Sequence, residues 1–311
     1  YTTGVANPYL LLEPSRTNLV PYSEYFDVWN QIQNVTLTAN SIISPSGESD
    51  GTKFLSTTGS SKVRNNFSAV SGTTYTLSVY CKNIDATFVR LLAYDGLSDY
   101  SAIVTSQINT STWTRVSLTF TAANTSTSGQ IQIARDLPDG ESLYFWGAQL
   151  EAGSYPTSYI PTYSVSATRA ADVCNKTDAS GVIGQTEGTV FIDINNRVLS
   201  PYPNEYVFYI TGTGGNQLWL RKESGGSNFT ARLVVGGSNV WTISITPPDG
   251  LTKIALAYKS GDSVVYLNGT QVNTSSATFS GNVLEDFYFS SVASAYPELK
   301  LNQNLLYKER L

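Results

Sequence analysis

The chain has 311 residues, a net charge of −5, and 14% charged residues, against roughly 25% in an average soluble protein. Its 12% aromatic content, with 20 tyrosines, excludes intrinsic disorder, because disordered chains lack aromatic and β-branched residues. The 19 basic residues are scattered along the sequence. A nucleic-acid binder concentrates Lys and Arg on one face, so neither a nucleic acid nor an anionic membrane surface is an expected partner.

Histidine is absent, which excludes Ser-His-Asp and Cys-His nucleophile systems and His-ligated zinc sites. The two cysteines, Cys81 and Cys174, are predicted to be buried or half-buried thiols, with a bridge between the modules as the alternative. No apolar run approaches the ~18 residues of a membrane span. Because the chain begins at Tyr1 and has no Met, we expect a processed product or a fragment.

The first half of the chain is predicted to form β-strands. Near its start, Ser23 is a candidate N-cap for a single helical turn that ends by Trp29. Beyond that turn, apolar residues alternate with polar ones, which is the pattern of a strand with one buried face. The predicted strands are 74–80, 88–94, 113–120, 130–133 and 143–146. Clusters of Gly, Asn, Asp and Ser separate these strands, so they indicate a sandwich or jelly roll.

The composition changes near residue 154 and the strand pattern is interrupted. Pro156 and Pro161 indicate an extended connector in this region. Alternation then resumes and predicts a second set of strands. These are 188–194, 205–210, 217–221, 230–235, 240–245, 252–258, 263–267 and 287–289. The dipeptide Asn268-Gly269, between two strand runs, predicts a tight hairpin.

We therefore predict an all-β protein with two tandem β-sandwich (jelly-roll) domains. An extended arm over residues 1–22 is expected to join the first sandwich, which occupies 23–163. A linker over 164–178 leads to the second sandwich at 179–311.

Two stretches carry a family resemblance. Residues 10–19 (LLLEPSRTNL), with 144–153 (YFWGAQLEAG) and 159–162, resemble the carbohydrate-binding-module-like jelly roll of bacteriophage tail, fibre and appendage proteins. Residues 253–272 resemble the strand–hairpin–strand of concanavalin A-like and laminin-G-like lectin sandwiches, and 299–311 resemble their last strand followed by a short helix. The resemblance implies a virion or surface adhesin.

Sugar binding uses aromatic rings flanked by polar side chains. In the first module the best candidates lie around one hairpin tip: Arg90, Tyr94, Asp95, Asp99 and Tyr100. The alternative is an ordinary β-turn whose Asp residues bond backbone donors.

In the second module, Trp219 and Arg221 share one face of a strand, opposite Leu218 and Leu220, and Tyr202 lies in a nearby loop. If the leucine face is the core, Trp219 faces outward and can stack on a sugar. The alternative is a strand packed on both faces. The remaining tryptophans considered, Trp29, Trp113 and Trp146, are expected to be core residues.

Catalysis is not expected. A glycosidase needs two carboxylates placed across the scissile bond, and Glu285 and Asp286 are adjacent in sequence, so they fall on opposite strand faces. The resemblance also implies a structural calcium ion near the first and last strands of the first module, for which Glu13 and Glu151 are the candidate ligands. No other cofactor is required.

The combined prediction is a non-catalytic receptor-binding module of a phage virion that engages host-surface polysaccharide. It would act beside other virion proteins, as a homotrimer by the resemblance, at the extracellular surface of the virion. The alternatives are a structural virion decoration or assembly protein without glycan binding, and a carbohydrate-binding accessory protein that is secreted or displayed on a bacterial surface.

Overall fold

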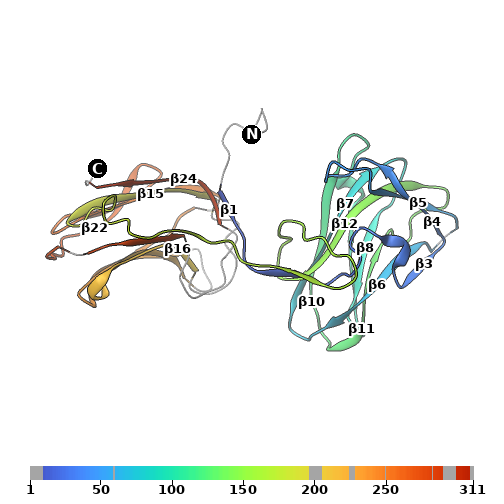
Figure 1. Ribbon diagram of the computed structural model, residues 1–311, viewed down its shortest axis with the longest axis horizontal. Helices are drawn as coiled ribbons and strands as arrows, with labels where there is room; N and C mark the ends of the chain where they lie inside the picture. The colour runs from blue at the N-terminus through green and yellow to red at the C-terminus, as the bar shows by residue number, and fades with distance from the viewer. Residues whose placement is uncertain are drawn as a thin grey trace. The chain divides into compact units, whose positions relative to one another are not determined.

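The computed structural model describes residues 10–58, 60–195, 205–223, 228–248, 250–281, 283–289 and 299–308. The chain forms two compact units, each built from two β-sheets around its own apolar core (Figure 1). We call Arg16–Arg169 the first sandwich, and Ala170–Leu311 together with Tyr1–Ser15 the second sandwich. The prediction of an all-β protein with two sandwiches is confirmed.

One sheet of the first sandwich has the strand order β10-β7-β12-β5-β4, and the other has the order β3-β6-β11-β8-β9. The strands of the former are β4 (Val35–Ile42), β5 (Gly51–Ser56), β7 (Thr74–Asn83), β10 (Thr114–Thr121) and β12 (Ser142–Ala152). The strands of the latter are β3 (Gln31–Gln33), β6 (Lys62–Ala69), β8 (Arg90–Tyr94), β9 (Asp99–Ile103) and β11 (Ser126–Ile133). Alternate residues of both sheets form one buried cluster, as their sequence alternation predicts.

Aromatic rings form the centre of this cluster. Phe54 packs edge-on against Phe26 and Phe145, with ring centroids 5.3 and 4.7 Å apart. All three rings are fully buried, and each contributes about 1.5–3 kcal/mol by leaving water. Trp29 belongs to the same cluster, as predicted.

The second sandwich has sheets of order β1-β24-β15-β20-β21-β22 and β14-β23-β16-β17-β18-β19. The strands of the former are β1 (Leu10–Leu12), β15 (Glu187–Asn195), β20 (Leu251–Lys259), β21 (Ser263–Leu267), β22 (Thr270–Ser275) and β24 (Leu299–Tyr307). The strands of the latter are β14 (Cys174–Lys176), β16 (Glu205–Thr211), β17 (Gln217–Lys222), β18 (Phe229–Val235), β19 (Ser238–Ile245) and β23 (Asp286–Phe289). Leu218 and Leu220 lie in the core between the sheets, so the leucine face of β17 is the buried one.

The division between the units differs from the predicted boundaries. The arm expected to join the first sandwich is split. Its strand β1 pairs with β24 of the second sandwich (Figure 1). Leu12 of this strand is buried in the core of the second sandwich. Only the continuation, β2 (Arg16–Asn18), belongs to the first sandwich, where it pairs with β13 (Ala167–Arg169). The expected linker likewise holds two short strands, β13 in one unit and β14 in the other. The chain therefore passes between the units twice.

The structure also tests three local predictions: one hairpin turn, one helical turn and a C-terminal helix. The hairpin at Asn268-Gly269 forms, and both residues have the positive φ that this turn requires, 49° and 83°. The predicted helical turn is a short 3-10 helix, η1 (Phe26–Val28), but its N-cap is Tyr25 rather than Ser23. The C-terminal segment stays in strand β24 to Tyr307 where a short helix was expected. In the described part of the chain, no helix has the length and apolar character to cross a bilayer.

Candidate functional site

The hairpin tip between β8 and β9 is organised around Asp95, which is fully buried. Its Oδ1 accepts hydrogen bonds from the backbone N–H groups of Leu97 and Ser98, at 2.9 and 2.7 Å. Its Oδ2 accepts bonds from the Ala123 N–H at 2.7 Å and the Tyr100 hydroxyl at 2.9 Å. The carboxylate thus joins the tip to the loop that follows β10.

These bonds keep Asp95 ionised. Burial alone would raise its pKa, but the hydrogen bonds from Ser98, Leu97, Tyr100 and Ala123 outweigh it and hold the pKa far below its ordinary value. The Tyr100 ring also stacks on Phe120, with centroids 4.9 Å apart. The structure therefore corrects the expectation that Asp95 and Tyr100 face a sugar, because both side chains stabilise the turn.

The other three candidates of this hairpin, Arg90, Tyr94 and Asp99, lie outside the hydrogen-bond network of Asp95. Arg90 and Tyr94 alternate with the core residues Leu91 and Ala93, so they point to the outer face of the sheet. Asp99 is opposite Tyr94 on β9 and is exposed. This outer face is polar: Tyr94 pairs with Gln130 of β11, and Gln130 pairs with Asn66 of β6.

The second sandwich carries an aromatic cluster on the outer face of its sheet β14-β23-β16-β17-β18-β19. We call it the aromatic face and define it by Tyr206, Tyr209, Trp219, Arg221, Arg232 and Tyr288. Strand register aligns four of these residues across adjacent strands, in the order Tyr288, Tyr209, Trp219 and Arg232. The predicted pair Trp219 and Arg221 belongs to this cluster.

Trp219 is covered rather than open to solvent. The Trp219 side chain points away from the core, as expected if the leucine face of the strand is the buried one. The residue is nevertheless only 3% exposed. The guanidinium carbons of Arg221 and Arg232 lie 5.0 and 5.1 Å from its ring centroid, and Tyr206 packs edge-on at 5.5 Å. These are cation–π and edge-to-face contacts. The expectation of an open Trp219 platform is thus corrected: its neighbours Tyr206, Tyr209 and Tyr288, all half-buried, are the accessible rings.

The charges of the aromatic face are partly paired. Nη2 of Arg221 donates to both carboxylate oxygens of Glu223, at 3.1 and 3.2 Å. Burial raises the pKa of Glu223, but the hydrogen bonds from Thr230 and Arg221 and the charges of Arg221 and Arg232 lower it below its ordinary value overall. Nε of Arg232 donates to the Thr242 hydroxyl at 3.1 Å. The face therefore offers guanidinium donors and an ionised acceptor beside three tyrosines.

Sequence reasoning missed most of this cluster. Alternation within 205–210 and 230–235 already placed Tyr209 and Arg232 opposite to core residues, which was the available signal. What the sequence did not give was the register that brings them beside Trp219. Tyr202 lies outside the described residues.

The two calcium candidates belong to different units. Glu13 is part of the second sandwich, where its backbone N–H donates to Asp172 at 2.9 Å, whereas Glu151 is part of the first. The carboxylate of Glu151 is buried and accepts bonds from the Thr157 N–H at 2.6 Å and hydroxyl at 2.9 Å, and from the Gln149 side chain. Among the described residues, no group of three or more acidic, Cys or His side chains has a metal-binding arrangement.

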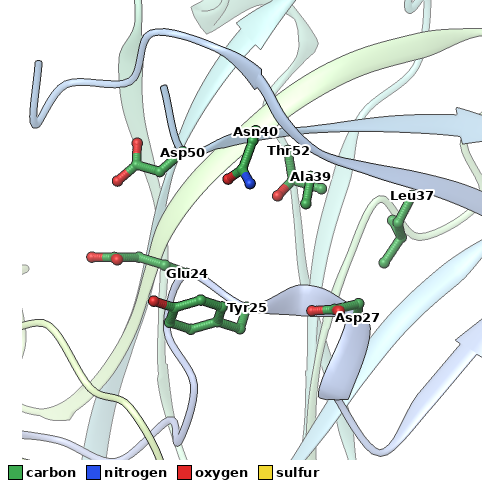
Figure 2. A pocket seen from close by; sticks show the side chains of 8 residues that line it. All are labelled: Glu24, Tyr25, Asp27, Leu37, Ala39, Asn40, Asp50 and Thr52. Atoms are coloured by element: carbon green, nitrogen blue, oxygen red, sulfur yellow. The ribbon is translucent and has the colours of Figure 1, made fainter. Parts of the chain in front are cut away.

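A pocket of about 200 Å³ lies on the first sandwich, between the segment around η1 and strands β4 and β5. In Figure 2, Glu24, Tyr25 and Asp50 line one end, Asn40, Ala39 and Thr52 the wall, and Asp27 and Leu37 the other end. Three carboxylates give this pocket an acidic lining that can accept hydrogen bonds from hydroxyl or amino groups.

The pKa of Glu24 in this pocket is raised above its ordinary value. Burial raises its pKa, a hydrogen bond from Tyr159 lowers it, and the charge of Asp50 raises it again, so the result lies above its ordinary value. The Tyr159 hydroxyl donates to Oε1 of Glu24 at 2.9 Å and lies 2.5 Å from the Ser23 hydroxyl.

The other residues singled out in the sequence are structural. Trp146 is buried on the outer side of β12 against Tyr159, with centroids 4.6 Å apart, rather than between the sheets. Trp113 is half-buried at a surface position and donates to the Ile43 carbonyl at 3.0 Å, which corrects its assignment to the core. Cys81 is buried and Cys174 half-buried, both as free thiols, as predicted.

The comparisons with known proteins are limited to fold. No protein-family model matches the chain, and no curated protein sequence matches it. Among solved structures, domains LG4-5 of the mouse laminin alpha1 chain match 75% of this chain and 82% of their own, with 9% identity and a TM-score of 0.32. Sheep galectin-11 matches 43% of this chain and 97% of its own, with 14% identity and a TM-score of 0.29. Similarity this low leaves the function to be inferred from the chain's own residues.

Proposed function

We propose that this protein binds glycans without catalysing a reaction, and that the aromatic face of the second sandwich is its binding site. The observation that carries the proposal is the row of Tyr288, Tyr209, Trp219 and Arg232, aligned across four adjacent strands. Tyrosine rings can pack on the apolar side of a sugar ring, while guanidinium groups donate hydrogen bonds in fixed directions to its oxygens.

The shape of the row suits an extended ligand. Neighbouring strands are about 4.8 Å apart, so three spacings make a strip about 14 Å long. The residues beside the strip are half-buried and held by mutual contacts: Tyr206 packs on both Tyr209 and Trp219, at 5.3 and 5.5 Å. Side chains already ordered before binding lose little conformational freedom when a ligand arrives.

The charges favour binding over hydrolysis. A glycosidase needs one carboxyl group that holds a proton at the working pH. The pKa of Glu223 is lowered, so this acid is ionised at neutral pH. Asp286, at the margin of the row, accepts hydrogen bonds from the Tyr288 hydroxyl and the Asp178 N–H and so is already engaged within the fold.

The finer role follows from the sequence resemblance. We propose that the ligand is a host-surface polysaccharide and that the protein acts as a receptor-binding module at the surface of a phage virion, as a homotrimer among other virion proteins. Several copies on one particle would raise the avidity of weak single sites. A structural virion protein and a bacterial surface or secreted accessory protein are the alternatives.

The test is binding to a panel of neutral and acidic bacterial and plant polysaccharides, measured by affinity electrophoresis and calorimetry. Tyr209→Ala should weaken binding by at least about tenfold, which equals ~1.4 kcal/mol and is typical of a central aromatic contact. The matched control is Tyr307→Ala, which removes an exposed tyrosine from β24 of the opposite sheet and should bind as the wild type does.

Three results would count against the proposal. Retention of no polysaccharide in the panel would favour the structural alternative. Equal binding by Tyr209→Ala and the wild type would show that the aromatic face is not the binding site. Release of reducing ends from any polysaccharide would show catalysis.

A further inference from the structure

Four cationic side chains gather on the first sandwich although they are scattered in the sequence. Lys62 and Arg64 lie on β6, Arg90 begins β8, and Arg135 follows β11. We call them the basic face. Lys62 and Arg64 flank the core residue Val63 and so point to the outer side of the sheet β3-β6-β11-β8-β9. The Arg135 N–H donates to the Arg90 carbonyl at 3.2 Å, which places these two residues side by side.

Positive charge on this face exceeds the negative charge paired with it. Asp136 is the one carboxylate that forms ion pairs with these cations in the described structure, and it is shared: Arg90 bonds its Oδ2, and Nε of Arg135 lies 3.3 Å from its Oδ1. Within the described residues, Lys62 and Arg64 form no ion pair. Burial and the charges of Arg135 and Arg64 lower the pKa of Lys62, as expected where like charges crowd together.

Side-chain amides surround the cations. On β3, Gln31 pairs with Arg64 and Gln33 pairs with Lys62. On the other side of β6, Gln132 of β11 also pairs with Arg64. The Asn66–Gln130–Tyr94 row is next to them. Such amides both donate and accept, which suits hydroxyl groups.

Gln132 gives a second, independent indication of a ligand. It is 8% exposed, and its Nε2 donates to Oε1 of Gln130 at 3.3 Å. Its own Oε1 is buried without a hydrogen-bond partner among the described residues. A buried acceptor left without a donor destabilises the fold, because its bonds to water are lost and not replaced. A ligand hydroxyl on this face would supply the missing donor.

We propose that the basic face is a second binding site, which takes a polysaccharide carrying carboxylate or sulfate groups. The cations pair with the acidic groups, the amides with the hydroxyls, and the sheet presents an extended surface along which several sugar units can lie. The site is on a different sandwich from the aromatic face, so either can fail without the other.

A nucleic acid fits this face less well. Single-stranded nucleic acid is bound on rows of stacked aromatic rings. Here Tyr94 stands among amides, and Phe88, 5.9 Å from the guanidinium carbon of Arg90, is at the margin.

The test uses probes that differ only in charge: polygalacturonate against its methyl ester, and dextran sulfate against dextran, each measured at low and physiological salt. The wild type should bind at least one acidic polymer more than tenfold tighter than its neutral counterpart, and added salt should weaken that binding. The two pairs distinguish carboxylate from sulfate recognition.

Matched variants locate the site. Lys62→Gln with Arg64→Gln should reduce binding of the acidic polymer at least tenfold. The control, Lys53→Gln with Lys82→Gln, makes the same charge change on the opposite sheet of the same sandwich, at positions that both pair with Tyr144, and should leave binding unchanged. Thermal unfolding of both double variants verifies that they fold.

The proposal is overturned if both double variants lose the same affinity, if acidic and neutral polymers bind equally, or if no acidic polymer binds. Tighter binding of single-stranded DNA than of every acidic polysaccharide would also overturn it, in favour of a nucleic-acid face. If a neutral glycan binds and Tyr209→Ala abolishes that binding, while no acidic polymer binds more tightly than its neutral counterpart, the proposed function stands and the basic face is not a glycan site.

Discussion

The Tyr100 hydroxyl donates a 2.9 Å hydrogen bond to Oδ2 of Asp95, so two residues that look like sugar ligands in the sequence satisfy each other in the fold. The same carboxylate accepts hydrogen bonds from four backbone N–H groups at 2.7–3.2 Å. A buried turn of this kind is structural, and its contribution can be measured.

Replacing Asp95 with alanine should lower the free energy of unfolding of the first sandwich by about 3 kcal/mol, because several buried donors lose their acceptor. Urea unfolding, with hydrogen exchange to assign the loss to the first sandwich, measures the effect. Asp99→Ala is the control: its exposed carboxylate should be worth less than about 0.5 kcal/mol. Equal losses from both variants would contradict the assigned role.

Glu24 and Asp95 should give opposite pH dependences. The pKa of Asp95 is lowered in the fold, so its stabilisation is complete above the ordinary Asp value of about 3.9 and is lost as pH falls. The pKa of Glu24 is raised, so the stabilisation from its protonated form is complete below about 4.3 and is lost as pH rises through the raised pKa.

As pH rises from 4 to 7, Glu24→Gln should therefore gain stability relative to the wild type. Asp95→Asn should be less stable than the wild type by a constant amount over that interval, and this difference should shrink as pH falls below about 3.9. Urea unfolding at a series of pH values measures both differences. Gln at position 24 keeps an acceptor for the Tyr159 hydroxyl, so the comparison isolates the charge. A Glu24→Gln difference that does not change with pH would contradict the raised pKa.

Trp219→Ala should destabilise the second sandwich by about 3 kcal/mol, because the ring is 3% exposed and carries two guanidinium contacts. Trp219→Phe keeps an aromatic ring and should cost less. Hydrogen exchange in β16, β17 and β18 reports the change. If Trp219→Ala is as stable as the wild type, the ring is not packed as described.

The interleaving of the two units predicts where a mutation near the N-terminus acts. Leu12→Ala should cost about 2–4 kcal/mol and reduce hydrogen-exchange protection in the second sandwich, since Leu12 is buried in that core. Val20→Ala, only eight positions further along, should instead affect the first sandwich. Loss of protection in the first sandwich on Leu12→Ala would contradict the pairing of β1 with β24.

By itself the sequence determined which residues form strands and which face of each strand is buried. Alternation is a local property: in β17 it put Leu218 and Leu220 on one face and Trp219 on the other, and the structure shows that the leucine face is the core. The absence of histidine likewise excluded whole classes of chemistry before any fold was known.

Only the tertiary structure decided which strands are neighbours, because pairing joins segments far apart in the chain and depends on register. That pairing set Arg232 over Trp219, covered the ring, and joined β1 to the second sandwich. It also brought Lys62 and Arg64 near Arg135, which the spacing along the sequence does not reveal. The fold class could therefore be predicted from local alternation, whereas both proposed binding faces depend on long-range strand register.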